Sequence, residues 1–276
     1  MINFVVMRII QQAFDFYINS SIHVAVAVLS LVLMTNHMFH NPMDLAMAGF
    51  AFFGTIFGYN FVKYESLFRN KKPIRKQLKA MLVLSLLSFL ISVFCFFKLE
   101  FNTQIAAVVF FGLTLLYTVP FFPNKDNLRN WSGVKIYIVA FCWAGITILL
   151  PLINAGTSIS TDVFLKFGQR FLLVIILILI FEIIDLKKDA PSLRTVPQKI
   201  GVKLTKVLGL SLLLPFYFLE FFKSDFNENQ LWINLILIVI TALFTIFANP
   251  NRSKYYTSFW VESIPVFWWL MVVLFQ

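Results

Sequence analysis

Long apolar runs alternate with short polar segments along the whole chain. A membrane-spanning α-helix needs about 20 predominantly apolar residues, and runs of that length recur here with Asn, Pro and Gly between them. The pattern predicts an all-α polytopic membrane protein, with residues 1–276 forming a single transmembrane domain. The nine predicted transmembrane helices are residues 18–39, 43–62, 79–97, 103–122, 133–153, 163–184, 203–222, 230–248 and 256–275.

The composition agrees with a membrane protein. Hydrophobic residues make up 59% of the chain and charged residues 13%, whereas soluble domains have about 45–50% and 25%. Cys95 and Cys142 lie within apolar runs, so we interpret both as packing residues. The first run is followed by His37, His40 and Asn41 rather than by small residues, and we therefore expect no cleaved signal peptide.

The distribution of Lys and Arg predicts the topology. Of the 23 basic residues, 19 fall at one set of span ends, and the other ends hold only Lys98, Lys166, Arg170 and Lys223. Because positively charged loops are retained in the cytoplasm, we expect a cell (inner) membrane protein with a cytoplasmic N-terminus and an outside C-terminus. Basic loops beside anionic lipid also explain the net charge of +10, so membrane lipid is an expected partner and nucleic acid is not.

Ionisable residues are nearly absent from the middles of the predicted spans. Such residues usually mark function when they lie within a membrane. Their scarcity argues against a proton-coupled transporter and places polar chemistry at the cytoplasmic interface. We interpret His23 as a buried histidine bonded to a neighbouring helix.

The strongest polar cluster closes the sixth predicted span and contains Glu182, Asp185 and Asp189. At 100° per residue, the three acids fall within about 60° on one helix face. Mg²⁺ is usually held by carboxylates, waters and substrate phosphates, so the three acids form a predicted magnesium site. The alternative is that Asp185 and Asp189, with Lys187 and Lys188, only solvate a helix end. Glu182 favours the site because it lies a turn deeper in the apolar run.

The segment from Glu182 to Gly201 resembles the second aspartate-rich motif of the UbiA-type intramembrane aromatic prenyltransferases. In that family, acids spaced by three and four residues precede a loop ending in Thr-x-Pro and a Gly, as in Thr195-Val196-Pro197 and Gly201. The resemblance implies a bundle around a lipid-facing cavity, where Mg²⁺ holds a prenyl diphosphate between two cytoplasmic motifs. Asp185 and Asp189 are then the expected catalytic residues.

The first motif of the family is degenerate in this chain. Asn60 matches, but the positions of the three expected aspartates hold Phe61, Tyr64 and Phe68. Glu65 is the remaining carboxylate near that face; it either holds a metal with Asn60 or is a solvated acid in a basic loop, and we favour the solvated acid.

Five residues are expected to bind substrate by the same resemblance: Asn60, Tyr117, Lys125, Arg129 and Arg194. Tyr117 is near the end of the fourth span, and Lys125 and Arg129 follow it. An interfacial aromatic belt and charges that retain a loop in the cytoplasm are the alternative explanation for these three.

We therefore expect a UbiA-like prenyltransferase that moves an isoprenoid chain from a prenyl diphosphate to an unidentified aromatic or lipid acceptor at the cytoplasmic membrane face. The alternative is a catalytically inactive UbiA-like protein that binds an isoprenoid lipid, which the missing acids at positions 61, 64 and 68 favour. A transporter or channel-like bundle is disfavoured by the empty helix centres.

Overall fold

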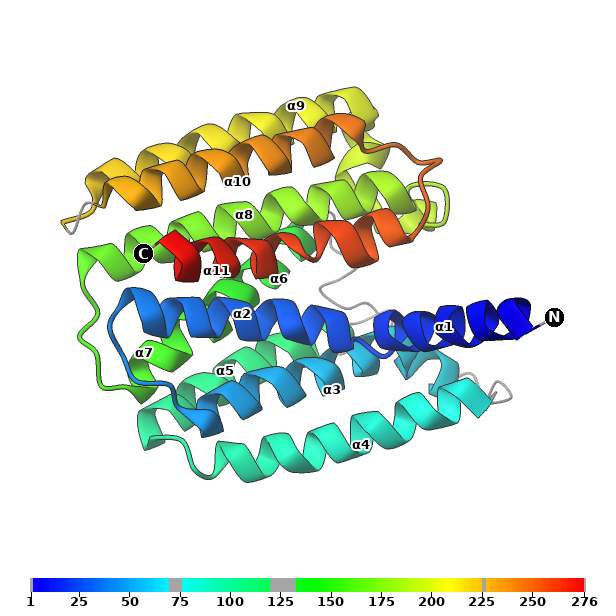
Figure 1. The fold of residues 1–276 in the computed structure, drawn as a ribbon, viewed down its shortest axis with the longest axis horizontal. Coiled ribbons are helices and arrows are strands. Elements are labelled where there is room, and N and C mark those ends of the chain that lie inside the picture. The colour runs from blue at the N-terminus through cyan, green and yellow to red at the C-terminus, as the bar shows by residue number, and fades with distance from the viewer. Residues whose placement is uncertain (1, 70–75, 120–132, 225–226, 276) are drawn as a thin grey trace.

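The computed structural model describes residues 2–69, 76–119, 133–224 and 227–275, which form a helical bundle (Figure 1). Its α-helices are α1 (Ile2–Asn19), α2 (Ile22–Met38), α3 (Leu45–Arg69), α4 (Lys76–Phe96), α5 (Phe101–Thr118), α6 (Val134–Ala144), α7 (Leu150–Asn154), α8 (Thr161–Asp185), α9 (Val196–Phe218), α10 (Glu228–Phe247) and α11 (Ile264–Phe275). Two π-helices, η3 (Gly145–Leu149) and η6 (Tyr256–Val261), and two 3₁₀-helices, η4 (Pro191–Leu193) and η5 (Leu219–Phe222), complete these elements.

Eight helical stretches of the described chain are long and apolar enough to cross a membrane. The protein is therefore an integral membrane protein with multiple spans, and the all-α prediction is confirmed. The stretches are residues 45–64, 78–96, 101–118, 134–154, 161–185, 196–222, 228–247 and 256–275. They match the last eight predicted spans closely, except that the stretch containing α9 begins at residue 196 instead of 203.

The first predicted span, residues 18–39, differs in structure from the others. Its helix α2 is preceded by α1, and the two helices meet at a 55° bend. Ser21 lies at this bend in the left-handed region, with φ 63°. Since α1 and α2 are long and apolar enough to cross a membrane only when taken together, the pair supplies the ninth candidate span. The polar Ser20 and Ser21 interrupt what the apolar pattern predicted as one helix.

Residues on both sides of the bend between α1 and α2 bond to the C-terminal part of the chain. Nζ of Lys254 lies 2.8 Å from the Asp15 carboxylate, which also accepts a hydrogen bond from the Tyr255 hydroxyl. The hydrogen bond to Asp15 raises the pKa of Lys254. His23 bonds to the Tyr17 hydroxyl at 2.8 Å and to the Phe259 carbonyl at 3.0 Å. The interpretation of His23 as bonded to a neighbouring helix is thus confirmed.

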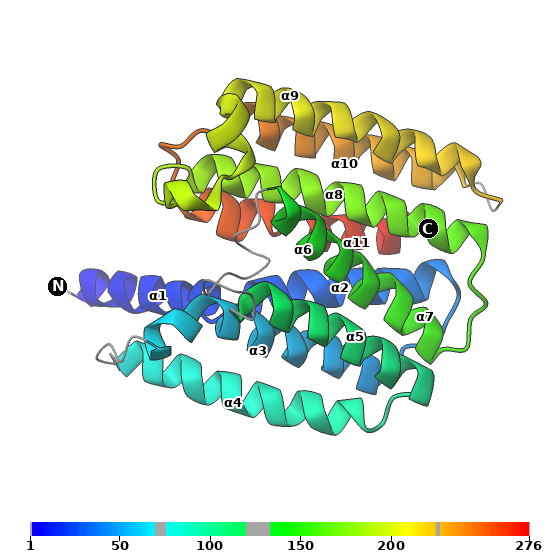
Figure 2. The same cartoon turned by 180° about the vertical axis from the view of Figure 1, so that it is seen from behind.

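The helices are arranged in rows across the bundle. In Figure 1, α9 and α10 form one edge and α3 and α4 the other, with α8, α11 and α2 between them. Figure 2 shows α5, α6 and α7 covering the opposite side. The largest apolar cluster joins α2, α8, α9, α10 and α11 around the buried rings of Phe216 and Trp268. Many outer side chains, such as Leu86 and Phe94 of α4, are exposed and apolar, as expected for surfaces in contact with lipid.

The π-helix η3 interrupts the span formed by α6 and α7. Its first residue, Gly145, packs directly under the ring of Phe110 from α5, and a methyl group added to Gly145 would overlap that ring. Glycine at position 145 therefore sets how closely α5 approaches this span. π-helical turns of this kind are rare and often occur at functional sites.

Candidate functional site

The acidic segment occupies the end of α8 and the turn that follows it. Asp185 is the last residue of α8, and residues 186–188 form a turn that leads to Asp189. Asp189 therefore lies beyond the helix, and the prediction that the three acids share one helix face is wrong. The N–H groups of Lys188 and Asp189 both bond to the Asp185 carbonyl, which closes the turn.

Glu182 has partners on two other helices. Its Oε1 lies 2.8 Å from Nζ of Lys135 in α6, and its Oε2 accepts a 2.8 Å hydrogen bond from the N–H of Val196. Val196 begins α9, so the carboxylate satisfies one of the N–H groups that a helix start leaves without a partner. With its side chain only 4% exposed, Glu182 fits a structural link among α6, α8 and α9 better than a metal ligand.

Asp185 and Asp189 differ from Glu182 in their surroundings. The Asp185 carboxylate lies 3.0 Å from Nζ of Lys188, and both side chains are substantially exposed. Exposed pairs of this kind contribute at most about 1 kcal/mol. The backbone carbonyl of Asp189 accepts a hydrogen bond from Gln198 at 3.3 Å. The acidic turn is thereby tied to the first turn of α9.

The start of α9 follows from its sequence. Thr195 and Gln198 form a reciprocal capping box, and Pro197 lies in the first turn, where its missing N–H is tolerated. Arg194, just before this cap, has a left-handed backbone with φ 44°. The Thr-x-Pro segment used to recognise the motif is therefore also the signal that begins the helix.

Asn60 lies in α3 opposite the bend between α1 and α2. Its amide donates to the Ser20 carbonyl at 3.0 Å and to Ser85 Oγ at 2.8 Å, and accepts from Ser21 Oγ at 2.9 Å. The side chain is 2% exposed. Asn60 therefore stabilises the bend and joins it to α3 and α4.

The substituted positions of the first motif take part in packing and in a hydrogen bond. The ring of Phe61 stacks on Phe57 with centroids 6.1 Å apart, and the Tyr64 hydroxyl donates to the Asn19 carbonyl at 2.9 Å. Neither side chain offers a carboxylate to a metal. The side chains of Glu65 and Phe68 lie outside the part of the chain that the structure describes in detail.

The other predicted substrate residues are only partly placed. Tyr117 lies in the last turn of α5, and Arg194 precedes α9. Lys125 and Arg129 fall in residues 120–132, outside the described residues. Within the described ranges, no three His, Cys, Asp or Glu side chains gather closely enough to hold a metal ion.

A buried polar network at the opposite end of α8 was not predicted from the sequence. Glu220 accepts hydrogen bonds from Gln169 at 2.9 Å and Asn234 at 2.8 Å, pairs with Lys223, and lies 3.5 Å from Nζ of Lys166. The Glu220 side chain is 1% exposed. The local signals were the pairs Glu220–Lys223 and Gln230–Asn234, each of which places polar groups on one helix face.

Arg170 is a second buried ion that the sequence interpretation missed. Its guanidinium donates to the Leu31 carbonyl at 3.2 Å and to Thr147 Oγ1 at 2.9 Å, and lies 5.4 Å from the Trp268 ring. It is 1% exposed and sits about 13 Å along α8. The expectation that span middles hold almost no ionisable groups is therefore wrong for this helix.

The fold places this chain in a structural class: it is a polytopic helical membrane bundle with a UbiA-like fold. A UbiA homolog from Archaeoglobus fulgidus bound to GPP and Mg²⁺ aligns with 94% of this chain and 98% of its own, with a TM-score of 0.61 and 10% identity. A digeranylgeranylglyceryl phosphate synthase aligns with 96% of this chain and 98% of its own, with a TM-score of 0.58 and 14% identity. The predicted UbiA-like fold is thus confirmed.

No protein-family model matches the chain, and no curated protein matches its sequence. The Archaeoglobus fulgidus homolog bound to DMAPP and Mg²⁺ gives a similar superposition, with a TM-score of 0.60 and 10% identity over 94% of this chain and 98% of its own. At such identities the shared feature is the fold.

Proposed function

We propose that this protein is a UbiA-like prenyltransferase, which moves an isoprenoid chain from a prenyl diphosphate to a hydrophobic acceptor of aromatic or lipid character. The observation that carries the proposal is the likeness over 94% of the chain to a UbiA homolog bound to GPP and Mg²⁺. The superposition with the same homolog bound to DMAPP supports a donor of this class.

The proposed site is the turn after α8. Asp185 and Asp189 would hold Mg²⁺ together with the donor diphosphate, and both are proposed as catalytic residues. Two carboxylates are enough in chemical terms, because protein-bound Mg²⁺ usually takes one or two carboxylates and completes its shell with waters and substrate phosphates. When bound, the metal would neutralise negative charge on the departing diphosphate.

The chain's own residues would orient this turn and bind the diphosphate. Glu182 is assigned a positioning role, because its contacts with Lys135 and Val196 fix the end of α8 against the start of α9. Arg194, Lys125 and Arg129 remain the proposed cationic partners of the diphosphate, since Lys and Arg both bind phosphate well. Tyr117 remains a proposed substrate contact.

Asn60 is the weakest member of the predicted substrate set. Its amide already makes three hydrogen bonds to Ser20, Ser21 and Ser85. A role in binding substrate would require some of these bonds to be exchanged. We therefore propose that Asn60 supports the site by holding the bend between α1 and α2.

The orientation in the membrane is part of the proposal. The 19 to 4 distribution of basic residues supports a cytoplasmic N-terminus, an outside C-terminus and a site at the cytoplasmic face of the cell (inner) membrane. We further propose that residues 1–276 form one transmembrane domain.

A second candidate is a non-catalytic protein that binds an isoprenoid lipid in the same fold. The specific observations that favour it are the packing of Phe61 and the hydrogen bond of Tyr64 at positions where the family has aspartates. The ion pair between Glu182 and Lys135 also favours this second candidate, because it gives the Glu182 carboxylate a partner other than a metal.

Binding of labelled GPP to the protein in nanodiscs tests both candidates. The prenyltransferase candidate predicts GPP binding that requires Mg²⁺ and is lost in the double variant Asp185→Asn/Asp189→Asn. Asp162→Asn, at the other end of α8, is the matched control and should bind normally. Binding that depends on neither Mg²⁺ nor the two aspartates, without product on addition of acceptors, would support the second candidate. No GPP binding would overturn the first.

A further inference from the structure

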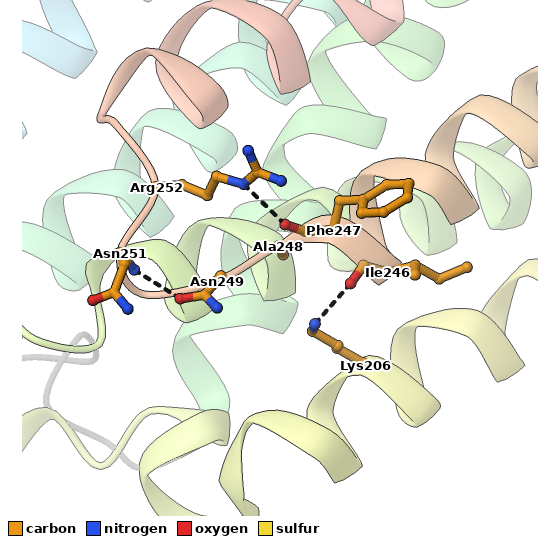
Figure 3. Close-up of a pocket in the computed structure, with 7 residues that line it drawn as sticks. All are labelled: Lys206, Ile246, Phe247, Ala248, Asn249, Asn251 and Arg252. Carbon is orange, nitrogen blue, oxygen red and sulfur yellow. Dashed lines mark hydrogen bonds between the residues drawn. The ribbon is translucent and has the colours of Figure 1, made fainter.

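A pocket opens between α9 and the end of α10, next to the acidic turn, whose Lys187 donates a hydrogen bond to Asn251 in the pocket lining. Its volume is about 360 Å³. Lys206 reaches it from α9, while the other side is formed by the last turn of α10 and the segment leading to η6 (Figure 3). The lining residues are Lys206, Ile246, Phe247, Ala248, Asn249, Asn251 and Arg252.

Two cations face this pocket and no acid lines it. Nζ of Lys206 donates to the Ile246 carbonyl at 2.7 Å, and Nε of Arg252 donates to the Phe247 carbonyl at 3.3 Å. These bonds satisfy carbonyl groups at the C-terminal end of α10. An ammonium group has three donors and a guanidinium five, so each cation keeps donors beyond these bonds.

The pocket adjoins an apolar outer surface. The side chains of Phe247 and Ile246, which line it, are 56% and 48% exposed, and Leu243 and Val207 on the same two helices are exposed as well. Helices α9 and α10 form an outer edge of the bundle (Figure 1). Because this chain is an integral membrane protein, these side chains lie where lipid tails would meet them.

We infer that this pocket binds the headgroup phosphate of an anionic phospholipid from the surrounding bilayer, with Lys206 and Arg252 as its cationic ligands. The acyl chains then run along the exposed side chains of α9 and α10. Basic pockets between transmembrane helices are suited to such headgroups. Such lipid binding does not require the proposed transferase function.

The residues that line the pocket favour an anionic phospholipid over inorganic phosphate. An inorganic phosphate would use the two cations but leave the apolar wall uncovered, whereas a phospholipid satisfies both. Two cations without a lining acid favour a headgroup of net negative charge over a zwitterionic one, whose own cation they would repel. The side-chain amides of Asn249 and Asn251 offer further donors to a headgroup.

Native mass spectrometry of the purified, delipidated protein tests the inference by titration with phosphatidylglycerol. The variant Lys206→Gln/Arg252→Gln should bind the first lipid about 25-fold more weakly than wild type, because each surface cation is worth about fivefold. The charge-conserving variant Lys206→Arg/Arg252→Lys should retain most of the affinity. The matched control is Lys203→Gln, an exposed lysine one turn away on α9, which should bind like wild type.

Three results would overturn the inference. They are unchanged affinity in the double Gln variant, an equal loss in Lys203→Gln, and displacement of the lipid by inorganic phosphate at similar concentration. Phosphatidylcholine should bind wild type more weakly and respond little to the substitutions.

A second measurement covers the case in which the double Gln variant fails to fold. A photoactivatable phosphatidylglycerol in nanodiscs should label wild type within residues 204–207 and 243–252. Labelling confined to other helices would also overturn the inference.

Discussion

Glu182 Oε1 lies 2.8 Å from Nζ of Lys135, in a pair whose side chains are 4% and 15% exposed. The other carboxylate oxygen caps the start of α9. One side chain thus connects three helices at the end of the bundle that carries the acidic turn. Removing one partner of such a pair leaves a buried charge uncompensated, which costs more than the pair itself contributes.

Glu182→Gln should lower the free energy of unfolding by about 3 kcal/mol. The amide oxygen of Gln can still accept the bond from Val196, so the loss reports mainly on the pair with Lys135. Thermal unfolding in detergent can be followed with a thiol-reactive dye, since Cys95 and Cys142 are both buried. Asp185→Asn, in an exposed pair, is the control and should cost less than about 1 kcal/mol. Equal stability of the two variants would contradict the assignment of Glu182.

Asn60→Ala should destabilise the protein by about 3 kcal/mol, because Ser20, Ser21 and Ser85 would each lose a buried hydrogen-bonding partner. Ser85→Ala removes one of these bonds and should cost about 1 kcal/mol. The same thermal assay measures both. If Asn60→Ala were as stable as wild type but lost GPP binding, Asn60 would be a substrate ligand instead of a support for the bend.

Glu220→Gln should be among the most damaging single substitutions, with a loss of about 3–5 kcal/mol. It removes the negative charge between Lys166 and Lys223 and leaves two cations buried without a counter-ion. Adding Lys166→Met should restore part of the stability, a non-additivity that a double-mutant cycle measures. Glu228→Gln, at the exposed start of α10, is the control and should change stability by under about 1 kcal/mol.

Gly145→Ala should cost about 1–3 kcal/mol, because the added methyl group overlaps the Phe110 ring and forces α5 away from the π-helix. Gly112→Ala is the matched control, since a methyl group there meets no atom within 4 Å. It should leave stability unchanged or raise it by up to about 1 kcal/mol. Additional loss of GPP binding in Gly145→Ala would connect the π-helix to the site.

The fold was largely predictable because lipid imposes a simple length rule on apolar runs. Eight spans follow from that rule, whereas the orientation inferred from the basic residues stays a prediction. The rule failed at two places where polar groups determine a helix boundary. Ser20 and Ser21 break the first run. The capping box of Thr195 and Gln198 begins α9 earlier than hydropathy indicates. Helix caps are local signals, so the second error was avoidable.

The candidate site was less predictable because its contacts join distant parts of the sequence. Lys135 precedes Glu182 by 47 residues and belongs to another helix, so no local pattern pairs them. Arg170 was assigned to a helix end from its position alone, yet its partners are a carbonyl of α2 and a hydroxyl of η3. Helical spacing suggested three acids on one face but could not reveal that α8 ends at Asp185.

Gly201 interrupts α9 with φ 80° and ψ 161°, values that no helix contains. Residues 196–200, before the break, are attached to α8 through Glu182, whereas Lys206, beyond it, is bonded to α10. Beyond the break α9 still packs on α8, where Gln169 donates to the Phe216 carbonyl at 3.1 Å. The positive φ at Gly201 therefore lets the start of α9 bond to α8 while Lys206 reaches α10, and a side chain at position 201 would strain this break while leaving the contacts of Glu182 in place.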